Sequence, residues 1–170
     1  MIIKKKLRIG NKIVEAGKVY KVFKISFENS NGKKERTIHY RPHYQGTNTD
    51  TLVCSVPECN MEHTDIRIPI EKTEMGELLK YLSKKSNKQW EVDVVNAKTI
   101  LNLNDVHETA RVAKVFWREK MKKDVNFTKT KKDVLESAID RMVEEVALVI
   151  GISVNTAKDK ITLALQKYPN

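Results

Sequence analysis

Three residues of the sequence could coordinate a soft metal ion, because Cys54, Cys59 and His63 follow one another within a short stretch. Zinc is bound tetrahedrally by cysteine sulfur and histidine nitrogen, and His39 and His43 lie upstream of this stretch. The spacing is not that of a zinc finger, and Cys54 falls in a predicted strand, where a cysteine is typical of a small core residue. We therefore expect structural or surface roles for Cys54, Cys59 and His63, and no bound metal.

Motifs of common enzyme classes are missing from the sequence. It contains no Gly-x-Gly-x-x-Gly, no Walker A motif and no Gly-x-Ser-x-Gly. Its six glycines in 170 residues leave few positions for the loops that cradle phosphate groups. We expect no enzymatic activity, no cofactor and no small-molecule substrate.

The chain has an excess of positive charge that extends over both halves. Its formal net charge is +10, from 32 Lys and Arg against 22 Asp and Glu. A basic protein attracts polyanions, and nucleic acid is the commonest of these inside a cell, although an anionic membrane would attract it equally on charge alone. Two cysteines suit a reducing cytosol, and no apolar run approaches the roughly 20 residues that span a bilayer. We expect a cytoplasmic protein that has no membrane partner.

The first half of the chain has the pattern of short β-strands. Strands are predicted over 12–14, 18–25, 36–40, 51–56 and 64–68, which are rich in β-branched and aromatic residues or alternate charged with apolar ones. A turn is predicted at 29–32, and loops are predicted over 41–50 and 57–63. Several short strands in such a small region predict an antiparallel β-barrel of the SH3 or Tudor type.

From Met75 onward the apolar residues recur with the period of α-helices. Helix faces are predicted from the sets Leu78, Leu79 and Leu82; Trp90, Val94, Ala97 and Leu101; Val106, Ala110, Ala113 and Trp117; Leu135, Ala138, Ile139, Met142 and Val146; and Ala157, Ile161 and Leu165. Asp105 begins a capping-box pattern, Gly151 can end a long helix, and Ser153 can begin the last one. The prediction is an α+β protein, in which a small N-terminal antiparallel β-barrel precedes an all-α C-terminal domain of about five helices.

One short segment near the C-terminus resembles a DNA-binding motif. Residues 148–165 are similar to the helix-turn-helix of sigma-factor region 4 and of LuxR-type regulators, where a Ser-Val-Asn-Thr element opens the recognition helix. In this alternative Asn155, Lys158 and Lys160 would face the major groove. Ordinary helix capping at Gly151 and Ser153 explains the same residues. A free-standing helix-turn-helix regulator that uses the last two helices is thus one hypothesis.

A longer resemblance begins at Trp90 and continues to the last helix. Asp105-Val106 follows Trp90 by fifteen positions, and the segments 110–118 and 144–148 come after it. This arrangement resembles the C-terminal domain of the CarD family of bacterial transcription regulators. That family has a tryptophan at the same distance from a Gly-Asp-Val helix start, then a Val-x-x-Leu-Trp-Arg element and a Glu-(Leu/Ile)-Ala-Leu segment.

The first half of the chain resembles the same family less closely. CarD proteins begin with a Tudor-like barrel that docks on the β subunit of RNA polymerase, and residues 8–14 and 65–69 resemble its first and last strands. Arg67 falls where the family has an arginine implicated in the polymerase contact. The family's Tyr-Pro-x-His-Gly element is missing, since residues 15–17 read Glu-Ala-Gly, and residues 41–63 resemble an insertion.

The resemblance implies a Tudor-like RNA polymerase-interacting domain over 1–72 and a helical DNA-binding domain over 73–170. It implies that Trp90 wedges into the minor groove of promoter DNA and modulates the stability of the open complex, since an apolar wedge holds DNA in a distorted state. The cations expected to meet DNA phosphates are Lys84, Lys85, Lys88 and Lys98. Trp117 is expected in the core.

One departure from the family lies beside Trp90. CarD proteins usually have basic residues just after the wedge tryptophan, whereas this chain has Glu91 and Asp93. Two carboxylates repel a phosphate backbone, so we expect weak affinity for DNA or a change in the sign of regulation.

Overall fold

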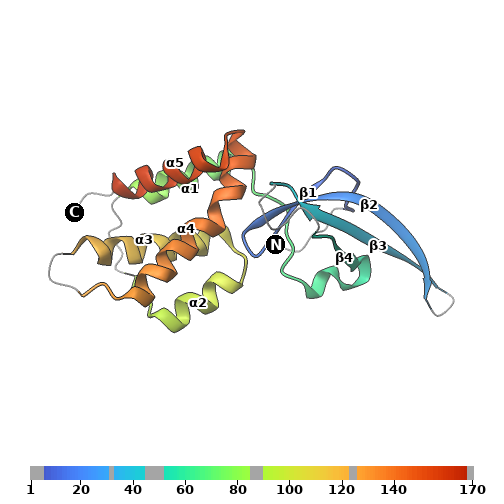
Figure 1. Ribbon diagram of the computed structural model, residues 1–170, viewed down its shortest axis with the longest axis horizontal. Helices are drawn as coiled ribbons and strands as arrows, with labels where there is room; N and C mark the ends of the chain where they lie inside the picture. The colour runs from blue at the N-terminus through green and yellow to red at the C-terminus, as the bar shows by residue number, and fades with distance from the viewer. Residues whose placement is uncertain (1–5, 31–32, 45–51, 85–89, 123–125, 168–170) are drawn as a thin grey trace. The chain divides into compact units, whose positions relative to one another are not determined.

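The chain folds into two compact units that differ in secondary structure. A computed structural model describes residues 6–30, 33–44, 52–84, 90–122 and 126–167. The boundary between the two units lies between Pro69 and Ile70 in the sequence. Within the described residues, the first unit contains four strands and a short 3-10 helix, and the second contains five α-helices (Figure 1). The predicted α+β class, with strands before helices, is confirmed.

The strands of the first unit form one antiparallel sheet. They are β1 (Lys12–Glu15), β2 (Lys18–Ser30), β3 (Lys33–Pro42) and β4 (Cys54–Pro57), and they are hydrogen-bonded in sequence order. The sheet curls into a half-barrel, in which β2 and β3 form a long ribbon (Figure 1). The predicted strands at 12–14, 18–25 and 36–40 are confirmed, and β4 begins later than predicted. Residues 31–32, 45–50 and 51, which belong to the predicted turn, loop and fourth strand, lie outside the described residues.

Two predictions for the end of this unit are wrong. The predicted loop at 57–63 contains the 3-10 helix η1 (Glu58–His63), which buries Met61. The predicted strand at 64–68 is reduced to an isolated bridge, in which Val14 and Arg67 exchange N–H···O bonds of 2.8 and 3.0 Å. Because residues 58–63 form η1, the chain after it pairs with β1 only through the Val14–Arg67 bridge. The sheet therefore stays a half-barrel.

A β-bulge in β2 changes which of its residues lie on the inner and which on the outer face of the sheet. Val22 is opposite Tyr40 and Lys24 is opposite His39, so Phe23 has no cross-strand partner. The inner face packs into a core made of Leu7, Ile13, Val22, Ile38, Tyr40, Val56, Met61 and Ile66. One extra residue shifts the alternation of a strand by one position, so Lys24 shares the outer face with Lys21.

The second unit consists of α1 (Lys72–Ser83), α2 (Val94–Asn102), α3 (Val106–Met121), α4 (Lys129–Ile150) and α5 (Val154–Gln166). In Figure 1, α4 lies beside α3, and α5 lies beside α1, as their contacts also show. Three predicted helix ends are confirmed. Asp105 accepts hydrogen bonds from the His107 and Glu108 amides, Gly151 ends α4 with φ 77°, and Ser153 caps α5.

The predicted helix faces are largely buried, and only Leu79, Trp90 and Val94 among their members are half-buried. Trp117 is 8 % exposed and therefore belongs to the core, as predicted. Trp90, in contrast, is not part of a helix, because α2 begins at Val94. Asp93 accepts a hydrogen bond of 2.9 Å from the Asn96 amide and so fixes the start of α2 after Trp90. Among the described residues, none of the helices has the length and apolar character needed to cross a membrane.

Candidate nucleic-acid interface

Trp90 lies on the extended segment that leads into α2, and two arginines of α3 hold it there. The guanidinium carbon of Arg111 is 4.3 Å from the centre of the indole ring. Arg118 donates a hydrogen bond of 3.1 Å from Nη2 to the Trp90 carbonyl. The two arginines are seven residues apart, almost two full turns, so they share one side of α3. The side chain of Trp90 is half-buried, which makes it neither a core residue nor a fully exposed one.

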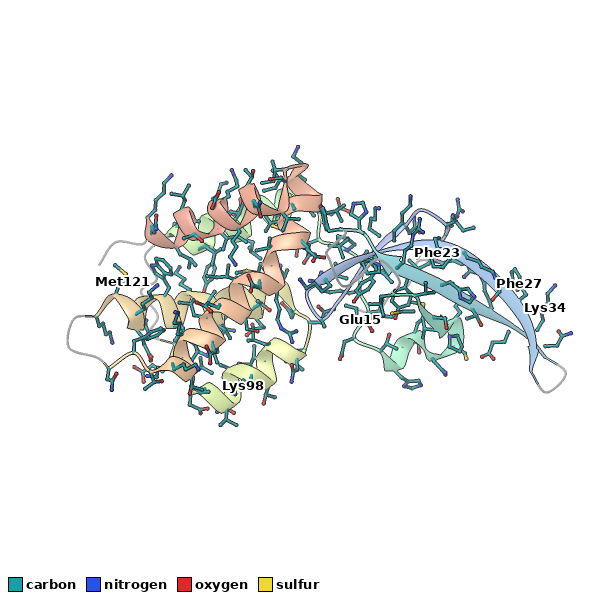
Figure 2. All side chains as sticks on the ribbon, in the orientation of Figure 1. Glu15, Phe23, Phe27, Lys34, Lys98 and Met121 are labelled. Atoms are coloured by element: carbon teal, nitrogen blue, oxygen red, sulfur yellow. The ribbon has the colours of Figure 1, made fainter. Side chains whose placement is uncertain are left out.

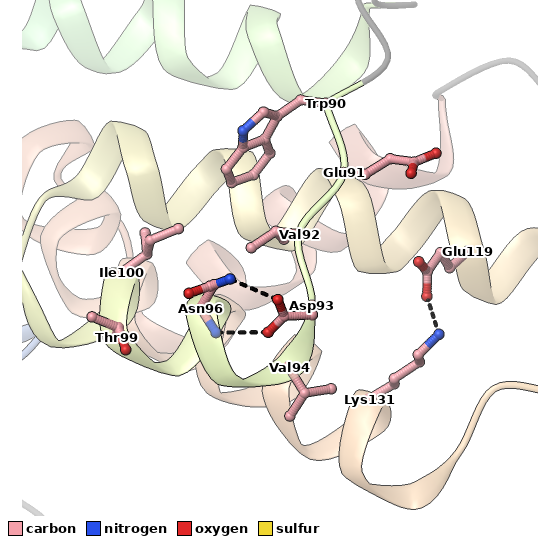
Figure 3. Close-up of a pocket in the computed structure, with 10 residues that line it drawn as sticks. All are labelled: Trp90, Glu91, Val92, Asp93, Val94, Asn96, Thr99, Ile100, Glu119 and Lys131. Atoms are coloured by element: carbon pink, nitrogen blue, oxygen red, sulfur yellow. Dashed lines mark hydrogen bonds and ion pairs between the residues drawn. The ribbon is translucent and has the colours of Figure 1, made fainter.

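A groove of about 810 Å³ opens beside Trp90. It is lined by Trp90, Glu91, Val92, Asp93, Val94, Asn96, Thr99, Ile100, Glu119 and Lys131. Figure 3 shows the indole ring and the Glu91 carboxylate projecting to opposite sides of the extended segment. The groove thus combines an apolar wall next to the indole with several carboxylates.

Two of the carboxylates in the groove are engaged within the protein. Asp93 caps α2, and the hydrogen bond from the Asn96 amide is the main cause that holds the pKa of Asp93 below its ordinary value. Glu119 forms an ion pair of 2.8 Å with Lys131, drawn as a dashed line in Figure 3. Glu91 is exposed. It is therefore the carboxylate of the groove that would most strongly repel a phosphate backbone.

The structure describes two of the four predicted lysines, Lys84 and Lys98, and neither of these two lines the groove beside Trp90. Lys84 is exposed at the C-terminal cap of α1, and Lys98 is exposed on α2. At about 100° per residue, Lys98 projects away from the side of α2 that carries Asn96 and Ile100, and it does not line the groove. Lys85 and Lys88 lie outside the described residues.

In the part of the chain that the structure describes, Arg111 and Arg118 contact Trp90, and sequence reasoning did not identify either of them. Both belong to α3, far from Trp90 in the sequence. The available signal was their seven-residue spacing in a predicted helix, which places two arginines on one face. That spacing does not reveal which segment the face contacts.

Arg67, the predicted polymerase contact, lies in the first unit at the bridge to β1. Its backbone N–H and carbonyl bond to Val14, and its Nη1 donates to the Ile68 carbonyl at 3.3 Å. The residue is half-buried. Because the backbone bonds hold the main chain, the position of Arg67 is fixed by the sheet.

The three residues of the helix-turn-helix alternative have different surroundings. Asn155 and Lys160 are exposed on α5. Lys158 forms an ion pair of 2.8 Å with Asp140 of α4, and the hydrogen bond to this carboxylate raises the pKa of Lys158. Its charge is therefore partly neutralised by α4, which weakens the case for a contact with DNA phosphates.

The cysteines of the candidate metal motif are both free thiols. Cys54 is half-buried and packs against the half-barrel core, as predicted. Cys59 is exposed and its Sγ donates a hydrogen bond of 2.7 Å to Glu35, which raises the pKa of the thiol. In the part of the chain that the structure describes, no three His, Cys, Asp or Glu residues are arranged to hold a metal ion.

Comparison with known protein families gives one result that bears on this groove. The family described as "CarD, C-terminal domain" matches residues 74–162, a span that includes Trp90, both arginines and the groove. A search of the curated proteins finds no match. The matched span is more than half of the 170 residues, so the chain belongs to the CarD family of transcription factors.

Proposed function

We propose that the protein is a transcription regulator that binds the β subunit of RNA polymerase and promoter DNA together. Residues 1–72 serve as the Tudor-like polymerase-binding domain, and residues 73–170 serve as the DNA-binding domain. The regulator changes the stability of the open promoter complex and acts in the cytoplasm, where bacterial RNA polymerase works. Membership of a transcription-factor family supports this general role.

The observation that carries the DNA half of the proposal is the way in which Trp90 is held. An apolar wedge must keep its position while it separates two base pairs, a step that costs a few kcal/mol of unstacking. Arg118 fixes the backbone of Trp90, and Arg111 fixes the plane of the ring. The short segment that leads from Trp90 into α2 can therefore present the indole without support from a helix.

The charge of Arg111 also bears on the acidic residues near Trp90. A guanidinium beside the ring gives a phosphate group a cationic partner, which offsets the repulsion from Glu91. Insertion of an apolar wedge does not depend on hydrogen bonds to particular bases, so the regulator acts at many promoters. Binding to polymerase supplies the location and raises the effective concentration of the wedge at the DNA.

The proposal is tested first on purified RNA polymerase without DNA. The full chain should bind polymerase, and Arg67→Glu should abolish binding while its circular dichroism spectrum stays that of the wild type. Lys34→Glu is the matched control, because Lys34 is an exposed cation of the same unit and is not proposed to contact polymerase. A folded Arg67→Glu variant that binds as tightly as the wild type would refute the assignment of Arg67. Absence of binding by the wild type would refute the proposed function.

A further inference from the structure

The outer face of the half-barrel carries rows of basic residues that run across the strands. Lys12, Lys21 and Arg41 are direct neighbours on β1, β2 and β3. The next outward-facing pair is Lys24 and His39, and it lies on the same face because of the bulge at Phe23. Without the bulge, Lys21 and Lys24 would lie on opposite faces of β2.

These cations lie close enough to repel one another. Like charges directly opposite each other on neighbouring strands are destabilising. Lys21, Lys24 and Arg41 are exposed, and no carboxylate among the described residues pairs with them. Burial, and then the charge of Lys21, lowers the pKa of Lys12. Binding of a polyanion to such a row of cations would reduce the repulsion between them.

Arg36, on the inner face of the same sheet, has polar partners within the protein. Arg36 is paired with Glu58 of η1 and also bonds to a backbone carbonyl. The charge of Arg36, which faces the core of this unit, is therefore neutralised within the protein. Lys21, Lys24 and Arg41, in contrast, are exposed to solvent on the outer face.

Aromatic rings lie between the outer-face cations. The Arg41 guanidinium is 5.4 Å from the centre of the Phe23 ring, and the Phe23 and His39 rings are 6.4 Å apart. Both rings are half-buried, so part of each remains accessible. Figure 2 shows Phe23 near the middle of the β2–β3 ribbon, with Phe27 and Lys34 nearer its tip.

We propose that the outer-face patch, formed by Lys21, Phe23, Lys24, His39 and Arg41, binds single-stranded nucleic acid. The three cations contact consecutive phosphates, and an unpaired base stacks against the aromatic rings. Cations that follow a backbone, with aromatic side chains between them, are the general means by which proteins hold single strands. Bases of a duplex are already stacked and cannot reach the rings, so single strands are favoured.

This patch is distinct from the surfaces of the proposed function. It lies in the first unit, whereas the groove at Trp90 lies in the second, and it does not include Arg67. Binding of single-stranded nucleic acid by this patch can therefore be tested separately from polymerase binding and from the Trp90 wedge.

The test is fluorescence anisotropy with the full chain and a fluorescein-labelled single-stranded DNA oligonucleotide of mixed sequence. The triple variant Lys21→Gln/Lys24→Gln/Arg41→Gln should lower the affinity about 100-fold in 0.1 M salt, because each phosphate contact on a single strand contributes a slope of roughly 0.7. The slope of log K against log salt should become less steep by about 2. Phe23→Leu, which keeps an apolar side chain but removes the ring, should lower the affinity at least about fivefold.

Phe27 and Lys34 provide the matched controls. They form a similar pair, with Lys34 Nζ 5.1 Å from the Phe27 ring centre, but their register places them on the other face of the ribbon. Phe27→Leu and Lys34→Gln should leave the affinity within about twofold of the wild type. If the triple variant misfolds, the single variants Lys21→Gln and Lys24→Gln replace it, each with an expected loss of about fivefold.

Three results would overturn the inference. The wild type could fail to bind the oligonucleotide, or the folded outer-face variants could bind it as tightly as the wild type. The same variants could also weaken binding of the matching duplex by the same factor, which would show that unpaired bases play no part.

Discussion

The guanidinium carbon of Arg111 lies 4.3 Å from the centre of the Trp90 ring. This contact joins α3 to a segment that has no secondary structure of its own. A cation over an indole is an attractive arrangement, and it restricts the orientation of the ring. The position of the candidate wedge therefore depends on α3 as much as on the segment that carries it.

Replacing Trp90 by alanine should cost an intermediate amount of stability. Truncation of a buried tryptophan costs about 3–5 kcal/mol, and truncation of a surface residue usually costs under about 1 kcal/mol. Because Trp90 is half-buried, we expect Trp90→Ala to lower the free energy of unfolding by about 1–3 kcal/mol and to leave the chain folded. Urea unfolding followed by circular dichroism measures the change.

The same variant should remove the effect on promoter opening while polymerase binding is unchanged. Because a wedge acts through apolar area, Trp90→Phe should retain part of the effect and Trp90→Ala almost none. The lifetime of the open complex, measured with each protein in turn, separates these outcomes. A folded Trp90→Ala protein that still changes the lifetime as the wild type does would contradict the wedge.

Arg118 should contribute more to stability than Arg111. A charge-assisted hydrogen bond contributes about 1.5–3 kcal/mol, and a cation over an accessible aromatic ring contributes about 0.5–1 kcal/mol. We expect Arg118→Met and Arg111→Met to lower the free energy of unfolding by these respective amounts. Lys120→Met is the control, since Lys120 is an exposed cation 5.1 Å from the Trp117 ring centre. Equal effects of all three changes would show that the two contacts to Trp90 have no special role.

Removing negative charge near Trp90 should strengthen duplex binding, but the two carboxylates need different substitutions. Glu91→Lys replaces an exposed carboxylate by a cation, and it should raise affinity for duplex DNA several-fold at low salt. Asp93 must keep its cap, so Asp93→Asn is preferable to a basic residue, because asparagine caps a helix as well as aspartate does. Anisotropy with a labelled duplex measures both changes, and unaltered affinity in Glu91→Lys would exclude a phosphate near this residue.

Asp93 also predicts an acid dependence of stability. Its pKa is lowered in the folded protein, so its contribution is complete above the ordinary value near 3.8 and is lost as the pH falls through the lower folded value. The melting temperature of the wild type should therefore fall more between pH 5 and pH 3 than that of Asp93→Asn. Identical falls in the two proteins would show that the Asp93 carboxylate makes no net contribution.

The last helix should be unimportant for DNA binding. Duplex affinity should be insensitive to sequence, with a salt slope of roughly −3 if about three cations meet phosphates. Lys158→Gln/Lys160→Gln should change it little, since Lys158 already pairs with Asp140. A tight, sequence-specific footprint that disappears in this double variant would instead support the helix-turn-helix alternative.

Local signals in the sequence were enough to predict three of the helix ends and most of the strands. Asp105, Gly151 and Ser153 act within a few residues of themselves, so their roles follow from nearby sequence alone. The same kind of signal was present at Asp93, but the helical spacing of Trp90 and Val94 suggested an earlier start of α2. A local cap overrode the periodicity.

Features that depend on contacts between distant segments could not be predicted in this way. The bulge at Phe23 is defined by the pairing of β2 with β3, and the sequence shows only two apolar residues in succession. The contact of Arg111 with Trp90 depends on how α3 packs against the segment before α2. Likewise, the spacing of residues 64–68 suited a strand, but the short path after η1 allowed only one bridge to β1.

The bridge between Val14 and Arg67 has a consequence for the order in which the chain folds. It joins the first strand of the unit to a residue near its end, so the half-barrel cannot close until Arg67 has left the ribosome. Such a contact between distant positions carries a large loop-closure entropy and slows folding. During synthesis, the β2–β3 hairpin can form early from neighbouring residues, whereas β1 gains its second neighbour only in the final step.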